Sequence, residues 1–142
     1  MTCCLEDALL TALRALDGTP IPSKNHFNLV RECEDCVPYL VLKNTDSPGL
    51  RTSSGTQKVS TVELNAYFSA DRKYQAYNYR TMITDWLDSG GIDLGDCGNF
   101  CVRSTGTARV AVAAGGLVRF SVTFVGVYNA VEVGSESLSG SV

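Results

Sequence analysis

The stretch L-V-R-F-S-V-T-F-V-G-V, residues 117 to 127, decides the fold of this chain. Val118, Phe120, Val122 and Phe124 form an apolar row that alternates with the residues between them. A period of two places alternate side chains on opposite faces of a β-strand, and β-branched and aromatic residues favour that structure. Because globular strands usually span ~5–6 residues, this long stretch predicts the central strand of a sheet with one apolar face.

Two upstream segments have the period of helices that bury one side. The first runs from Leu5 to Leu16, with Thr2 as its expected N-cap and Gly18 as the glycine that ends it. The second follows Asp71, which is expected to cap it, and ends at Gly90-Gly91. Its apolar stripe contains Tyr79, Met82, Ile83, Trp86 and Leu87. Each helix can therefore cover the apolar face of a sheet.

Two further strands are predicted between these helices. The first is V-P-Y-L-V-L at residues 37 to 42, and the second alternates apolar and polar residues from Val62 to Phe68. The residues from Asn44 to Gln57 are rich in Ser, Thr, Gly and Asp, which predicts a long loop. We expect the two strands to pair antiparallel across this loop.

The final hairpin depends on the length of its loop. A two-residue Gly115-Gly116 turn would place Val110 and Val112 on the face opposite Phe120, whereas an odd-length loop would place them beside Val118 and Phe120. The odd-length loop is favoured because it unites the large apolar side chains. Together these segments predict an α+β fold, a mainly antiparallel twisted sheet with two α-helices packed on one face. A single domain is expected at residues 1–133, followed by a flexible tail at 134–142.

Composition narrows the classes of function. The 142 residues are 44% hydrophobic and 19% charged with a net charge of −3, which is typical of a globular domain without the basic field that grips nucleic acid. Glu6, Asp7 and Arg14 interrupt the first apolar segment, so it predicts neither a signal peptide nor a membrane span. We expect the protein to fold in a reducing cytoplasm, where its six cysteines are more often thiols or metal ligands than disulfides.

Candidate chemistry is sparse. Cys33-x-x-Cys36 and Cys97-x-x-x-Cys101 have spacings that could bind one zinc ion, although independent thiols account for them as well. His26, the sole histidine, lies in no catalytic motif and is expected at the surface or at a helix cap. Three aspartates in a glycine-rich stretch are explained by turn chemistry: Asp88, Asp93 and Asp96. The sequence predicts no catalytic residue, no cofactor and no resident metal.

The order of these segments resembles a known family. An N-terminal amphipathic helix is followed by P-Y-L-V-L, T-V-E-L-N-A-Y-F, a helix from D-R-K-Y to D-W-L-D, and V-R-F-S-V-T-F. This series, from Leu5 to Tyr128, resembles the tail terminator proteins of long-tailed bacteriophages, small subunits that cap the tail tube and join it to the head. The family has no catalytic residues. The cysteines are not explained by its pattern, which leaves a small zinc-stabilised interaction module, or another neck or minor tail component, as alternatives.

The resemblance implies a place in a virion, assembled in the host cytoplasm. It implies a ring, usually of six subunits, that binds the tail tube protein on one side and a head-completion or neck protein on the other. DNA would pass through the lumen without sequence-specific binding. Because tyrosines and surplus apolar strand residues are typical of protein interfaces, we expect the following residues to contact neighbouring subunits: Tyr74, Tyr77, Val125, Val127 and Val131.

Overall fold

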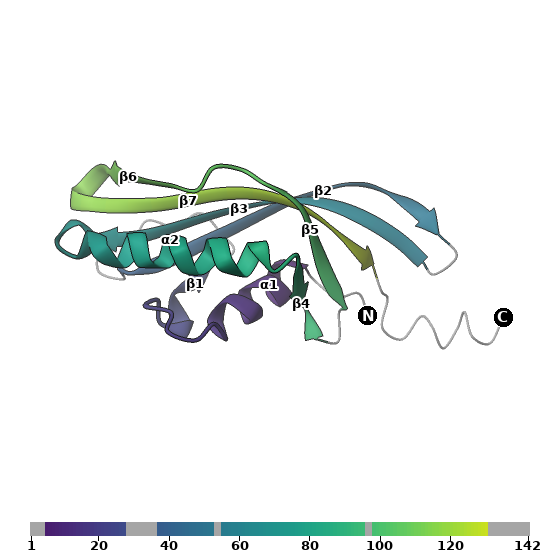
Figure 1. The fold of residues 1–142 in the computed structure, drawn as a ribbon, viewed down its shortest axis with the longest axis horizontal. Coiled ribbons are helices and arrows are strands. Elements are labelled where there is room, and N and C mark those ends of the chain that lie inside the picture. The colour runs from purple at the N-terminus through teal and green to yellow at the C-terminus, as the bar shows by residue number, and fades with distance from the viewer. Residues whose placement is uncertain (1–4, 28–36, 53–54, 96–97, 131–142) are drawn as a thin grey trace.

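The computed structural model describes residues 5–27, 37–52, 55–95 and 98–130. Its helices and strands follow one another as α1 (Leu5–Arg14), β1 (His26–Phe27), β2 (Tyr39–Thr52), β3 (Gly55–Ser69), α2 (Lys73–Asp88), β4 (Gly91–Asp93), β5 (Asn99–Thr105), β6 (Arg109–Ala113) and β7 (Leu117–Ala130). The strands form one curved sheet, and both helices lie against the same face of it (Figure 1). The predicted α+β class and the placement of the helices are confirmed.

Strand β7 is the centre of the sheet. The strand order is β1-β2-β3-β7-β5-β4, and β6 also pairs with β7. β3 runs antiparallel to β7 along its whole length, in an unbroken register from Thr56 opposite Ala130 to Ser69 opposite Leu117. β5 and β6 divide the other edge of β7 between them. Only the short β1–β2 pair is parallel among the described strands. The sequence stretch that decides the fold is thus paired on both sides.

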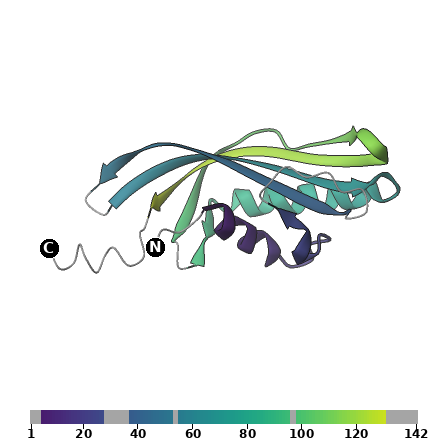
Figure 2. The same ribbon diagram turned by 180° about the vertical axis from the view of Figure 1, so that it is seen from behind.

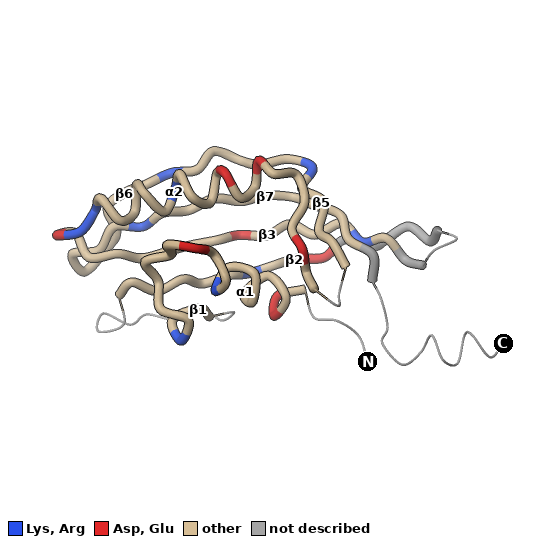
Figure 3. Tube along the Cα trace, turned by 60° about the horizontal axis from the view of Figure 1, so that its bottom comes forward, with Lys and Arg blue, Asp and Glu red and all other residues tan. Residues whose placement is uncertain are grey.

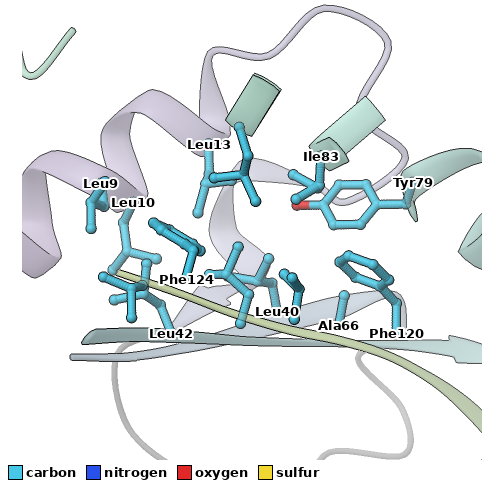
Figure 4. Close-up of a cluster of buried hydrophobic side chains, with 14 of the residues drawn as sticks. Leu9, Leu10, Leu13, Leu40, Leu42, Ala66, Tyr79, Ile83, Phe120 and Phe124 are labelled. Atoms are coloured by element: carbon cyan, nitrogen blue, oxygen red, sulfur yellow. The ribbon is translucent and has the colours of Figure 1, made fainter. Parts of the chain in front are cut away.

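The core lies between the sheet and the two helices. Val118, Phe120, Val122 and Phe124 are all buried, as the period of two predicts, whereas Arg119 and Thr123 on the opposite face are exposed. α1 contributes Leu9 and Leu13 and α2 contributes Tyr79 and Ile83, which meet strand residues such as Leu40, Leu42 and Phe124 (Figure 4). The Tyr79 ring packs edge-on against Phe120 with ring centroids 5.7 Å apart. Both apolar stripes therefore face one common core.

The predicted loop from Asn44 to Gln57 is wrong. β2 continues to Thr52 and β3 begins at Gly55, so nearly all of this segment is a two-stranded ribbon. The ribbon extends past the helices, which do not cover its far end (Figures 1 and 2). A strand that has no layer packed on either face does not need alternating apolar residues. The paired residues Thr45 and Thr61, for example, are both polar and exposed. Polar composition here indicates an uncovered strand.

Smaller differences concern the ends of elements. Asp71 does not cap α2; it lies in a 3-10 turn over Ala70–Arg72, and α2 begins at Lys73 without a side-chain cap. The glycine-rich stretch after the second helix, for which turn chemistry was expected, also contains β4, which pairs with β5. Thr2 and the tail at 134–142 lie outside the described residues.

The odd-length loop of the last hairpin is confirmed. Val110 pairs with Phe120 and Val112 pairs with Val118, across a turn of three residues, 114–116. Gly115 has φ +74°, a left-handed conformation that suits glycine. Val112, next to the end of the edge strand β6, nevertheless remains 88% exposed, whereas Val110 packs against the core.

Candidate interaction surface

The face of the sheet that points away from the helices is polar over its middle. Along β7 and β3, Thr123 lies opposite Glu63 and Ser121 lies opposite Asn65. β6 extends the second of these rows, because Arg109 pairs with Ser121. These side chains alternate with the core rows, so the strand period that builds the core also places them on the open face.

An apolar patch follows at the far end of the same face. Val59 pairs with Val127, and Val125 is two residues away on β7, so the three side chains form a small cluster. Val59 is 37% exposed, and both valines of β7 are half-buried. β5 adds the exposed thiol of Cys101, which pairs with Val127. We call the cluster of Val59, Val125 and Val127 the valine patch.

The expected interface residues separate into two surfaces. Tyr74 and Tyr77 are 58% and 45% exposed on the outer side of α2, which lies on the helix-covered face. Val125 and Val127 lie on the opposite face of the sheet, so the structure does not bring the tyrosines and the valines together. Val131 lies outside the described residues. Each surface must therefore be considered by itself as a contact region.

A shallow polar cavity of about 330 Å³ lies on the open face. Its lining is Glu63, Asn65, Gly106, Thr107, Arg109, Arg119, Ser121, Val122 and Thr123. The backbone N–H of Gly106 donates a hydrogen bond of 2.7 Å to the carbonyl oxygen of Thr123, which holds the β5–β6 connection at the rim. Its arginines, amide and hydroxyls can hydrogen bond to a protein surface. Among its lining residues there is no histidine or cysteine that could form a nucleophile–base pair.

His26 is buried, which corrects the expectation of a surface or cap histidine. It is 3% exposed and begins β1, where its register partner is the core residue Leu40. Its Nδ1 lies 3.0 Å from the carbonyl oxygen of Pro22, so Nδ1 carries the proton that is donated. Burial lowers the pKa of His26, with a smaller contribution in the same direction from the Arg14 guanidinium. His26 is thus a neutral core residue near neutral pH.

Three of the four cysteines considered as zinc ligands lie outside the described residues. These are Cys33, Cys36 and Cys97, whereas Cys101 is an exposed free thiol. Within the described ranges, no group of three or more His, Cys, Asp or Glu side chains is placed to hold a metal ion. Asp93 Oδ1 accepts a hydrogen bond of 2.8 Å from the Gly95 backbone N–H, which is the turn chemistry expected for it.

Sequence reasoning missed Val59 and the residues that line the cavity. The predicted strand began at Val62, and Val59 lies on the opposite face from the apolar row that contains Val62, so the alternation gave no reason to include it. The cavity depends on Gly106 and Thr107, which reach the open face through a register shift between Val102 and Ser104 in β5. A bulge of this kind leaves no periodic signal in a sequence.

Of the comparisons with known proteins, the search of solved structures bears on the fold. No protein-family model matches the sequence, and a search of curated proteins finds no match. A search of solved structures finds a chain of the virion of a native gene transfer agent (GTA) particle, with a TM-score of 0.58 and 13% sequence identity. The match covers 88% of this chain and 94% of that chain. At this identity the likeness shows a shared fold.

No helix within the described residues is long and apolar enough to cross a membrane.

Proposed function

We propose that this chain is a structural protein of a phage-like virion, which caps the tail tube as a ring and joins the tail to the head or neck. The observation that carries the proposal is the fold likeness to a chain of the gene transfer agent virion, which covers nearly the whole of both chains. The order of elements from Leu5 to Tyr128 resembles the tail terminator family and supports the finer position.

The surfaces support a role in assembly rather than in catalysis. One sheet face is left open over β3 and β7, and it carries the valine patch of Val59, Val125 and Val127. Two tyrosines are exposed on the other side of the molecule, on α2. Exposed apolar and aromatic groups on both sides suit a subunit that contacts several neighbours. The partners of the proposal are further copies of this chain, a tail tube protein and a head-completion or neck protein.

The proposal is tested on particles made with and without the chain. Particles from a host that carries the intact gene should contain the chain by mass spectrometry, at a constant number of copies per particle. A stop codon early in the gene should leave heads and tails that sediment separately, and expression of the chain from a plasmid should restore joined particles. Joined, active particles formed in the absence of the chain would refute the proposal.

A further inference from the structure

The outer face of α2 is divided into two chemically different halves. Lys73, Tyr74, Tyr77 and Arg80 occupy its first two turns, and the Arg80 guanidinium carbon lies 5.0 Å from the centroid of the Tyr77 ring. Asp85 and Asp88 are exposed in its last turn. In Figure 3 the blue segments lie toward the start of α2 and the red segments toward its end. We call these surfaces the basic tyrosine half and the acidic half.

This charge distribution opposes the dipole of the helix. A helix is stabilised by negative side chains in its first turn and positive side chains in its last turn. α1 follows this rule, with Glu6 and Asp7 in the first turn and Arg14 in the last. α2 reverses it, with Lys73 but no acidic residue in the first turn, and with two aspartates but no basic residue in the last. The reversal is unfavourable for the isolated helix and leaves charges of opposite sign at its two ends.

Most of these charges have no charged partner among the described residues. Within the described parts of the structure, Lys73, Asp85 and Asp88 form no ion pair. The two exposed tyrosines present phenol groups that can donate hydrogen bonds to carboxylates while their rings bury apolar area. The basic tyrosine half and the acidic half are therefore complementary in charge. Because both lie on the outer side of one helix, they cannot contact each other within a single copy of the chain.

We propose that the basic tyrosine half of α2 in one copy of the chain docks against the acidic half of α2 in the next copy. The two halves are separated by roughly 16 Å along the helix axis, because Tyr74 and Asp85 are eleven residues apart and the rise is about 1.5 Å per residue. One helix therefore carries both partners of a head-to-tail contact. The inference rests on the proposed ring, which requires two different patches per subunit.

The contact is tested by reversing each half in turn. In the first variant Lys73→Glu is combined with Arg80→Glu, and in the second Asp85→Lys is combined with Asp88→Lys. Sedimentation velocity of the full chain should show that the wild type associates and that each variant alone stays monomeric. An equimolar mixture of the two variants should associate as the wild type does, because each reversed half meets a reversed partner. Association of the wild type should weaken at high salt, since exposed charges are screened.

The helix dipole supplies a control for misfolding. Lys73→Glu, Asp85→Lys and Asp88→Lys place charges in the first or last turn as the dipole favours, whereas Arg80 lies mid-helix, so neither monomer should melt far below the wild-type monomer. Loss of association without loss of stability separates docking from unfolding. A further control, Lys24→Glu with Lys43→Glu, makes the same change in net charge as the first variant, at exposed positions away from α2, and should leave association unchanged.

Several outcomes would overturn the inference. Variants that associate as well as the wild type, a mixture that stays monomeric, or assembly that stops at a dimer would each exclude head-to-tail docking through α2. A wild type that is monomeric alone but present in particles would leave the virion role intact and assign the α2 surface to a different protein. Charge-dependent association of a chain that particles do not require would support the docking and refute the virion role.

Discussion

The two faces of β7 differ in what their neighbours require of them. Toward the helices, Phe120 and Phe124 are fully enclosed, and their rings pack against aromatic side chains of α2 and β5. Toward the open side, Arg119 and Thr123 are exposed and no helix of the described residues packs over them (Figure 1). Adjacent residues of β7 point to opposite faces. The same substitution should therefore have very different effects at two neighbouring positions. Folding constrains one face, and the other is free to serve contacts.

The largest expected effect comes from a charge on the covered face. Phe120→Asp buries an unpaired carboxylate in the core, which should cost more than about 4 kcal/mol and unfold a domain whose total stability is about 5–15 kcal/mol. Its control, Thr123→Asp, faces Glu63 across the strands and should cost no more than about 1 kcal/mol. Circular dichroism with urea denaturation measures both. Equal stability of the two variants would mean that the faces are wrongly assigned.

The next largest loss of stability is expected at Gly126, where β7 lies close to β5. A Cβ at Gly126 would overlap the ring of Phe100 and lie 2.8 Å from the carbonyl oxygen of Cys101. Gly126→Ala should therefore cost about 2–3 kcal/mol through displacement of a buried ring. Gly91→Ala is a matched control, since a Cβ there meets no atom within 4 Å. A Gly126→Ala protein with unchanged thermal stability would show that β5 and β7 can separate freely.

The next effect depends on pH and concerns a buried group on the covered side. Because burial lowers the folded-state pKa of His26, the unfolded chain binds a proton first as the pH falls below about 6.5. Stability should be complete above that pH and should fall by up to about 1 kcal/mol by pH 5.5. Urea denaturation at pH 7.5 and 5.5 measures the change. His26→Gln should lose less stability over the same range, and an equal loss would assign the pH dependence to other groups.

The smallest effect on stability should accompany a clear effect on assembly. Val127→Glu alters the half-buried valine patch on the open face, so its free energy of unfolding should change by less than about 0.5 kcal/mol. We expect it nevertheless to block ring formation, because the charge would be buried in a subunit contact. Sedimentation of the variant beside the wild type measures this. Rings that form as readily as those of the wild type would remove the valine patch from the interface.

The covered face was predictable from the sequence because burial imposes a period. The alternation at Val118, Phe120 and Phe124 gave the strand, its face and, through the preference for uniting Val110 with Phe120, the length of the last turn. The open face has no such constraint. The ribbon beyond Asn44 was mistaken for a loop because polar strand residues and polar loop residues have the same composition.

For the candidate interaction surface, the sequence predicted individual residues but not how they are placed relative to one another. Tyr74 and Tyr77, expected at an interface because of their residue type, are exposed on α2, and Tyr79, placed in the apolar stripe by the helical period, is buried. The separation of the two exposed tyrosines from Val125 and Val127 depends on which face of the sheet the helices cover, and that is a property of the assembled layers. His26 was misjudged because the backbone carbonyl groups of residues 22 and 23 accept the hydrogen bond of its buried ring. Any residue has a backbone carbonyl group, so the sequence does not reveal these partners.

The unbroken register between β3 and β7 also has a mechanical consequence. A pull directed along β7 loads every hydrogen bond of that ladder in shear, so they must fail together, whereas a pull across the strands would open them one after another. Resistance to force should therefore depend strongly on direction. A subunit anchored so that tension follows β7 would be stiff in that direction, and it would still peel apart under a small load applied at right angles to it.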